Sequence, residues 1–261
     1  MKYYKQAYNY LKYLINAKSR HGTHSPFVYK LLDECIYNKK GHSEYARIEN
    51  IRKQLLISNE YIEITDFGAG SKIDNSNKRK IKDIAKYSAK KAKYGKLLFN
   101  ICTYFNPKTG LELGSSLGIS TLYQALAAKE MLLYTLEGCP NTAKIAQANF
   151  EKANAPNIKL ITGSFEQTLT PFLDQLDSLD YAFFDGNHKK EPTLSYFHSC
   201  LQKKHNDTVF IFDDIHWSEE MEEAWEAIKN HPEVTVTLDL FMVGIVFFRR
   251  EQPKEHFIIR Y

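Results

Sequence analysis

The amino-acid sequence predicts an α/β fold: a Rossmann-like sheet of seven strands that ends in an antiparallel hairpin and follows a mainly helical N-terminal cap. Three observations predict it. After Pro107, short apolar runs alternate with helical stretches, which is typical of βα units on a parallel sheet. Leu111–Thr121 combines the end of an apolar strand, a glycine turn and a helix start. Two β-rich runs, Val234–Leu238 and Val243–Arg249, are joined by a short connection, so we expect them to pair antiparallel.

The parallel part of the sheet is predicted from five apolar runs, each followed by a segment with one polar and one apolar helical face. The expected strands are 109–113, 132–136, 158–162, 179–184 and 208–212. The expected helices are 117–128, 140–153, 165–176, 191–203 and 217–230. With the closing antiparallel pair, these runs make seven strands.

The N-terminal region has a different pattern. Apolar and aromatic residues recur three and four apart, as in Tyr4–Ile15 and Phe27–Ile36, and a third helix is expected over Glu44–Ile57. Residues 1–95 carry 20 Lys or Arg against 9 Asp or Glu, whereas residues 96–261 carry 15 against 22. We therefore predict two domains, a basic helical cap over 1–95 and a ligand-binding α/β domain over 96–261. The basic cap could attract an anionic substrate, an RNA or a membrane surface, or it could simply be a solvated, lysine-rich helical face.

Length and composition limit the class of protein. A chain of 261 residues with 43% hydrophobic content can bury a substantial core. No apolar run reaches the roughly 20 residues that span a bilayer, and the first residues lack the apolar region of a signal peptide, so we expect a cytoplasmic protein with no membrane partner. The four cysteines are far apart and form no C-x-x-C pair, which argues against a zinc site and a disulfide framework.

The glycine turn within Leu111–Thr121 is the first candidate ligand site. Gly114 and Gly118 allow a tight backbone and a close ligand, and Glu112 offers a carboxylate at the end of the strand. The two glycines are four residues apart, unlike the G-x-G-x-x-G spacing that fits a pyrophosphate. The turn therefore suits a ligand without phosphates, although an ordinary structural βα turn would also explain it.

Four motifs at successive strand ends carry a family resemblance. They are Leu111–Gly118, Glu137, Gly163–Glu166 and Phe184–Gly186. In this order, residues 96–261 resemble a class I S-adenosylmethionine-dependent methyltransferase. The resemblance implies the fold and a methyltransferase activity for this part of the chain.

The same resemblance implies a set of cofactor-binding residues. In that family the glycine turn receives the amino acid part of S-adenosylmethionine, and Glu137 matches the acid that hydrogen-bonds both ribose hydroxyls. Ser164 and Phe165 lie where the family contacts adenine. Taken alone, Glu137 could be a solvated acid and Phe165 a core residue. The positions implied for cofactor binding are Glu112, Gly114, Ser116, Gly118, Ser120, Glu137, Ser164, Phe165 and Asp185.

Acidic residues follow the fourth and fifth predicted strands, in Asp185–His188 and Asp213–Trp217. Converging carboxylates repel one another unless they are neutralised, and hard oxygen ligands suit Mg²⁺ or Ca²⁺. In the cation-dependent catechol O-methyltransferase-like branch, the matching positions bind a divalent metal. The resemblance therefore implies Mg²⁺ or another divalent cation held by Asp185, Asp213 and Asp214. Helix N-capping is the alternative for Asp213 and Asp214.

The catalytic residues implied by this comparison are His188, as general base, and Asp185. The ordinary pKa of histidine, roughly 6.5, suits proton removal near neutrality. Supporting a neighbouring ligand or lying on the surface are alternatives for His188, because Asn187 precedes it where several relatives have other residues. His216 and Trp217 could line a substrate pocket or pack a helix start.

These inferences predict a cation-assisted O-methyltransferase acting on a small hydroxylated acceptor. The alternatives are an N-methyltransferase acting on an amine, an RNA or a protein, and a non-catalytic binding module with the same fold. Nucleic acid is thus an alternative partner, with the basic cap as its recognition surface. Arg20–Phe27 is expected to be a lid segment or a capped interhelical turn, and Asp66–Ser71 to imitate a cofactor turn or form a substrate loop.

Overall fold

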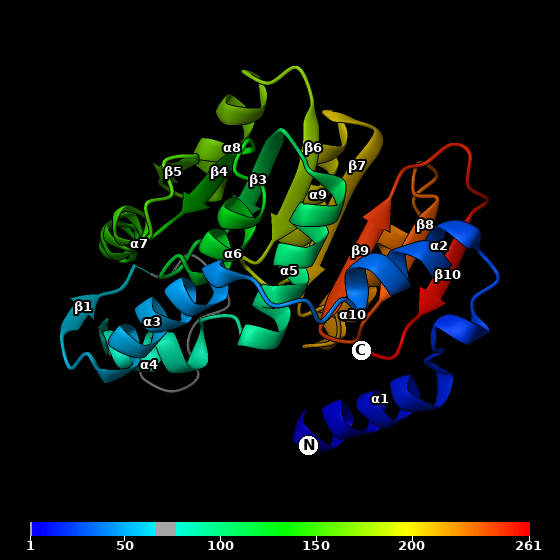
Figure 1. Ribbon diagram of the computed structural model, residues 1–261, viewed down its shortest axis with the longest axis horizontal. Coiled ribbons are helices and arrows are strands. Elements are labelled where there is room, and N and C mark those ends of the chain that lie inside the picture. The colour runs from blue at the N-terminus through cyan, green and yellow to red at the C-terminus, as the bar shows by residue number, and fades with distance from the viewer. Residues whose placement is uncertain (1, 66–76) are drawn as a thin grey trace. The chain divides into compact units, whose positions relative to one another are not determined.

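The computed structural model describes residues 2–65 and 77–261 (Figure 1). The Asp66–Ser71 segment therefore lies outside the described residues. The chain divides into two compact units. The first unit contains residues 1–37 and 173–261, and the second contains residues 38–172.

The second unit contains a parallel three-stranded segment of sheet, in the order β3-β4-β5. A short antiparallel pair, β1 and β2, stands apart from it. The strands are β1 (Tyr61–Glu63), β2 (Lys78–Lys80), β3 (Thr109–Leu113), β4 (Leu132–Glu137) and β5 (Ile158–Thr162). The helices are α3 (Ser43–Ile57), α4 (Ile81–Tyr87), α5 (Ala92–Phe105), α6 (Ile119–Ala127), α7 (Pro140–Lys152) and α8 (Phe165–Leu173), the last of which ends at the boundary of the unit.

The first unit contains five strands in the order β10-β8-β9-β7-β6. β6 and β7 are parallel, and β9 pairs antiparallel with both β7 and β8. The strands are β6 (Leu179–Phe184), β7 (Lys204–Asp213), β8 (Val236–Asp239), β9 (Val243–Phe247) and β10 (Glu255–Ile258). The helices are α1 (Lys2–Asn16), α2 (Pro26–Leu31), α9 (Lys190–Leu201) and α10 (Glu219–Asn230), with a 3-10 turn at Arg20–Gly22 and a π-helical turn at Leu32–Ile36.

The α/β fold and the closing antiparallel pair are confirmed, but the strand count is corrected. The two units hold five and three strands of the main sheet segments, eight where the sequence predicts seven. The additional strand is β10, which pairs parallel with β8. Its residues alternate between half-buried and exposed and form no apolar run, so local sequence gives no strand signal. Pairing with a distant strand makes it β.

The helical N-terminal region contributes to both units. Residues 1–37 group with the C-terminal part of the chain, and the rest of the expected cap groups with β3–β5. Tyr13 is buried on α1, and its hydroxyl donates to the carbonyl of Ile259. The amide of Lys18 donates to the carbonyl of Ile258 at 2.8 Å. The two-domain division at residue 95 remains a prediction.

The core of the second unit packs aromatic and aliphatic side chains from α3, α5, α6 and α7. Tyr123 is fully buried, and its hydroxyl donates to Glu49 at 2.8 Å. Glu49 also pairs with Arg52 at 3.0 Å. These polar contacts keep buried groups satisfied in the apolar layer that supports α6. Among the described residues, no helix is both long and apolar enough to cross a membrane.

Candidate active site

The glycine turn has the backbone that the sequence predicts for a close ligand. After β3, three residues take positive φ values: Gly114 at 98°, Ser116 at 48° and Gly118 at 82°. Gly118 is the N-cap residue of α6, and the amide of Gly114 donates to the carbonyl of Leu136 at 2.9 Å. Left-handed backbone lets a ligand approach closely, and the N-terminal end of a helix favours a carboxylate or other anionic group.

Gly118 is needed for packing as well as for backbone geometry. A Cβ atom at this position would lie 2.4 Å from Cε1 of Phe150 and 3.4 Å from Cα of Ala146, both on α7. A side chain at residue 118 would therefore push α7 away from the turn. Close helix packing and a positive φ both select glycine here.

Glu137, at the end of β4, lies beside this turn. Its Oε2 accepts a hydrogen bond from the amide of Ser116 at 2.8 Å, and its Oε1 accepts one from the amide of Cys139 at 3.0 Å. Burial raises the pKa of Glu137, although both amide hydrogen bonds oppose the rise. The structure thus brings together the acid predicted to bind ribose and the turn predicted to bind the amino acid part of the cofactor.

Glu112 lies beneath the turn and is fully buried. Its carboxylate accepts hydrogen bonds from the side chains of Thr121, Thr135 and Gln124, the last two at 2.7 Å. Ser120, on the first turn of α6, also hydrogen-bonds this carboxylate. Donors of the chain itself surround Glu112, so the structure shows a carboxylate that joins β3, β4 and α6 and fixes the turn from below.

Replacing Glu112 by glutamine is expected to change how stability depends on pH. Burial raises the pKa of Glu112 above the ordinary value of 4.5, while its hydroxyl and amide donors oppose the rise. A group whose pKa is higher in the folded state than in the unfolded state stabilises the fold at pH values below its unfolded-state pKa. That stabilisation is lost as the pH rises through the folded-state pKa. We therefore compare the free energy of unfolding of the wild type with that of Glu112→Gln. The difference, wild type minus variant, should become smaller as the pH rises above about 4.5.

Urea unfolding of both proteins across this pH range measures the difference. Other titrating groups are common to the two proteins and cancel. A difference that does not change with pH would contradict the raised pKa of Glu112.

The loop after β5 supplies two further residues of the predicted cofactor site. The amide of Gly163 donates to the main-chain carbonyl of Glu137 at 3.0 Å. Ser164 is buried, and its carbonyl accepts hydrogen bonds from the amides of Gln167 and Thr168 at the start of α8. Phe165 is the first residue of that helix. The second unit therefore presents Ser164 and Phe165 at the end of β5, next to the strand that ends in Glu137.

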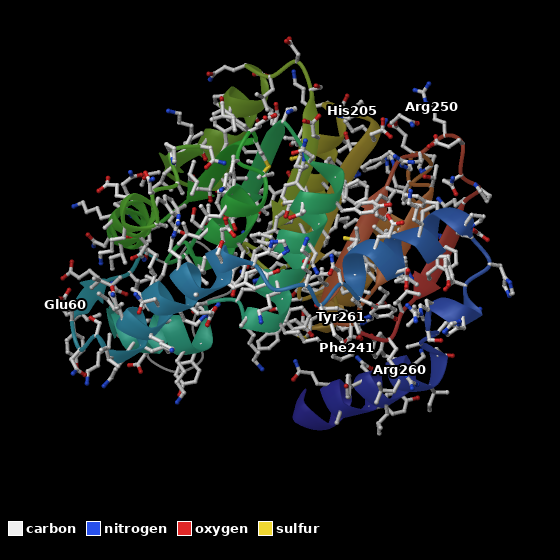
Figure 2. All side chains as sticks on the ribbon, in the orientation of Figure 1. Glu60, His205, Phe241, Arg250, Arg260 and Tyr261 are labelled. Carbon is white, nitrogen blue, oxygen red and sulfur yellow. The ribbon has the colours of Figure 1, made fainter. Side chains whose placement is uncertain are left out.

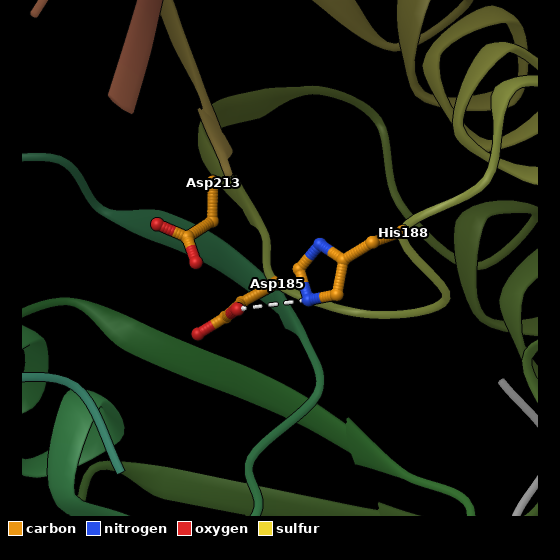
Figure 3. A group of neighbouring side chains, drawn as sticks. All are labelled: Asp185, His188 and Asp213. Atoms are coloured by element: carbon orange, nitrogen blue, oxygen red, sulfur yellow. Dashed lines mark ion pairs between the residues drawn. The ribbon is translucent and has the colours of Figure 1, made fainter. Parts of the chain in front are cut away.

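The first unit brings Asp185, His188 and Asp213 together (Figure 3). Potential ligand atoms of these three side chains all lie within 4.8 Å of one another. Asp213 is the last residue of β7 and Asp185 follows β6, and the two strands are parallel neighbours with Phe184 opposite Phe212. Parallel strands end at the same sheet edge, and for this reason the two acids meet.

The turn after β6 returns His188 to this group. Asn187 has a positive φ of 53°, and the amide of Lys189 donates to the carbonyl of Asn187. Nε2 of His188 lies 3.6 Å from Oδ1 of Asp185. The side chains of His188 and Asp185 are 25% and 15% exposed, and Asp213 is only 2% exposed. Solvent therefore reaches His188 and Asp185 in part, whereas Asp213 is buried.

Asp214, the third predicted metal ligand, lies outside this group. Its φ is 54°, and its amide donates to the carbonyl of Met242 at 2.7 Å. The structure instead includes His188, which the sequence singled out as a base and not as a ligand. The D-x-x-H spacing of Asp185 and His188 was the available signal, but only the tight turn at Asn187 shows that the two side chains meet.

The chemistry of this donor set fits a divalent cation. Two carboxylates and one imidazole converge, and one carboxylate is almost completely buried. Burying like charges side by side is costly without a compensating positive charge. Carboxylate oxygens with an imidazole nitrogen are ligands that first-row divalent metals and Mg²⁺ accept.

Residues 111–215 match a family model described as a methyltransferase domain, a segment that begins on β3 and includes both groups of site residues. No curated protein matches the sequence.

Several solved structures share the fold. An O-methyltransferase from Bacillus cereus, in complex with SAH, has a TM-score of 0.55 and 18% identity, covering 81% of this chain and 93% of that chain. An SAH-bound methyltransferase from Podospora anserina has a TM-score of 0.61 and 15% identity, covering 87% and 97%. The O-methyltransferase TomG from Streptomyces achromogenes, in complex with SAM, has a TM-score of 0.57 and 16% identity, covering 80% and 91%.

Fold and strand-end residues together define the class of protein. The chain has the fold of these methyltransferase structures. Residues 111–215 match the methyltransferase domain model.

Proposed function

We propose that the protein is an S-adenosylmethionine-dependent methyltransferase that methylates a hydroxyl group of a small acceptor with the help of a divalent cation. The observation that carries this proposal is the convergence of Asp185, His188 and Asp213 at the ends of β6 and β7. A group of this composition serves to bind a cation and to accept a proton. It occurs in a chain with a methyltransferase domain.

The methyl donor is assigned to the second unit. The turn from Gly114 to Gly118 binds its amino acid part, and Glu137 accepts hydrogen bonds from the ribose hydroxyls. Glu137 already accepts two amide hydrogen bonds, which hold its carboxylate at the turn. Ser164 and Phe165 contact the adenine. In this proposal Glu112 keeps the turn in shape through Thr121, Thr135 and Gln124.

The acceptor is assigned to the first unit. A divalent cation held by the carboxylates of Asp185 and Asp213 would lower the pKa of an acceptor hydroxyl and orient it. His188 and Asp185 act in the proton transfer. The imidazole of His188 takes the proton from the hydroxyl, and the carboxylate of Asp185, 3.6 Å away, stabilises the imidazolium. The acceptor oxygen forms a bond to the methyl carbon as the carbon–sulfur bond breaks, which leaves neutral S-adenosylhomocysteine. Alignment supplies much of the rate, since the sulfonium is already a good leaving group.

Glu137→Gln tests the assignment of the donor site. We expect isothermal titration calorimetry to show that the wild type binds S-adenosylhomocysteine. The variant should bind it about 10-fold more weakly or worse, since a hydrogen bond to a charged group contributes about 1.5–3 kcal/mol. Glu151→Gln is the matched control, because Glu151 is an exposed α7 residue whose side chain accepts a hydrogen bond from Gln147.

A methyl-transfer assay against pooled catechols, polyphenols, sugars and amines, with Mg²⁺ and with EDTA, identifies the acceptor class. Transfer to hydroxylated acceptors that EDTA abolishes supports the proposal. Failure of the wild type to bind S-adenosylhomocysteine at millimolar concentration would show a binding module instead. Transfer to amines alone would indicate an N-methyltransferase.

A further inference from the structure

The loop between β7 and α10 begins directly after Asp213 and includes Asp214. It is held by the carboxylate of Asp239, at the end of β8. Oδ2 of Asp239 lies 2.7 Å from Nε2 of His216, and its Oδ1 accepts a hydrogen bond from the amide of Phe241 at 2.8 Å. Asp239 is 7% exposed. One buried carboxylate therefore joins the β7–α10 loop, which contains His216, to the β8–β9 turn, which contains Phe241.

The β8–β9 turn in turn holds the backbone of the acidic residues. The carbonyl of Met242 accepts the hydrogen bond from the amide of Asp214 at 2.7 Å, and Asp213 pairs with Val243 in the β7–β9 ladder. Phe241, in the middle of the turn, has a positive φ of 70°. A bulky residue adopts this conformation only when its surroundings fix it, and the hydrogen bond to Asp239 is one such contact.

Helix α1 covers the same loop and turn (Figure 2). The ring of His216 stacks on Phe241, with centroids 5.2 Å apart and an interplanar angle of 18°. Tyr10 and Tyr13 of α1 contact the ring of Phe241 at centroid distances of 4.9 and 5.2 Å. The side chain of Gln6 donates to the carbonyl of Trp217 at 3.3 Å. The loop is thus held between α1 and the sheet.

Both ring nitrogens of His216 are engaged. Nδ1 lies 3.3 Å from Oε1 of Glu222, which also accepts a hydrogen bond from Asn9 on α1. Nε2 is occupied by Asp239. Both nitrogens of His216 therefore bind side chains of the chain itself, and this histidine does not contribute them to a substrate pocket.

We infer that Asp239 is a positioning residue of the acidic group: through His216 and Phe241 it fixes the backbone on which Asp213 and Asp214 are mounted, and so sets the affinity for the cation. This inference rests on the proposed function. Partners that orient metal ligands typically change metal affinity about 10- to 100-fold when they are removed. The Asp239 side chain bonds His216 and the amide of Phe241, so it acts through backbone placement.

The test is Mn²⁺ binding to the full chain, measured by calorimetry for the wild type, Asp239→Ala and Asp239→Asn. Asp239→Ala removes both contacts and should raise the Kd for Mn²⁺ about 10- to 100-fold. Asp239→Asn keeps an oxygen that can accept the hydrogen bond from the amide of Phe241. Its Kd for Mn²⁺ should therefore lie between those of the wild type and Asp239→Ala. The Kd for S-adenosylhomocysteine should stay within about twofold in both variants, because the Asp239 side chain contacts His216 and Phe241, neither of which is a predicted cofactor-binding residue. Asp207→Asn, an exposed acid on β7 that pairs with Arg249, is the control.

Three results separate the explanations. If the wild type binds Mn²⁺ and both Asp239 variants bind it equally well, the inference is wrong and the proposed function stands. If the wild type binds no Mn²⁺ and EDTA leaves methyl transfer unchanged, the cation-assisted function fails and the inference fails with it. If Asp239→Ala does not fold, His216→Gln replaces it, and an unchanged Mn²⁺ affinity in both His216→Gln and Asp239→Asn would overturn the inference.

Discussion

Replacing Asp213 by asparagine is expected to lower kcat for methyl transfer about 100-fold or more, since a bound cation contributes several kcal/mol of transition-state stabilisation. Asparagine keeps the shape of this nearly buried side chain but removes the charge that holds a cation beside Asp185 and His188. We expect EDTA treatment of the wild type to have an effect of similar size. Steady-state kinetics with and without Mg²⁺ measure both.

The same substitution should not lower thermal stability. In the cation-free protein, the carboxylates of Asp213 and Asp185 lie within 4.8 Å, and removing one of two neighbouring like charges relieves repulsion. The Tm of Asp213→Asn without metal should therefore equal or exceed that of the wild type. Asp207→Asn on the same strand should change neither kcat nor Mg²⁺ dependence. Unchanged activity of Asp213→Asn, together with resistance to EDTA, would show that catalysis does not need the cation.

The second large effect is expected at Gly118. Gly118→Ala should lower the free energy of unfolding by about 2–4 kcal/mol, from the cost of a left-handed non-glycine residue and from overpacking against Phe150. This expectation is based on the φ of 82° and on the 2.4 Å distance that an added Cβ would have from the Phe150 ring. Affinity for S-adenosylhomocysteine should fall as well, because the amides of the turn would move. Urea unfolding and calorimetry measure the two effects.

Two variants make this prediction specific. Gly41→Ala places its Cβ in open space and should change stability by no more than about 0.5 kcal/mol. Adding Phe150→Leu to Gly118→Ala should recover the part of the loss that comes from the ring contact, and a double-mutant cycle measures that part. Equal losses for Gly118→Ala and Gly41→Ala would contradict the tight packing of α7 on the turn.

Local sequence was sufficient for most elements of the α/β part. Strands 109–113, 158–162 and 179–184 were predicted with the boundaries that β3, β5 and β6 have. Their signal is a short run rich in apolar residues and bounded by turn residues, which depends on neighbours along the chain only. β10 lacked that signal, because Glu255–Ile258 is an exposed edge whose strand conformation comes from pairing with β8.

The site was predicted in part for the same reason. Glu137 was expected near the turn, and its hydrogen bond to Ser116 now joins the two. The internal donors around Glu112 could not be foreseen, because they come from two other elements, α6 and β4. The acidic group contains His188 and not Asp214. This depends on the positive φ angles of Asn187 and Asp214, which no sequence pattern predicts.

By itself, the sequence determined which residue types end each strand of this protein: glycines after β3, an acid at the end of β4, and acids after β6 and at the end of β7. Apolar periodicity and turn residues act over a few positions, so they fix where strands end. Only the tertiary structure decided which of those side chains meet. Such encounters depend on strand pairing, on the tight turn that returns His188 to Asp185, and on α1 and Asp239, which hold the loop of Asp213 from opposite ends of the chain.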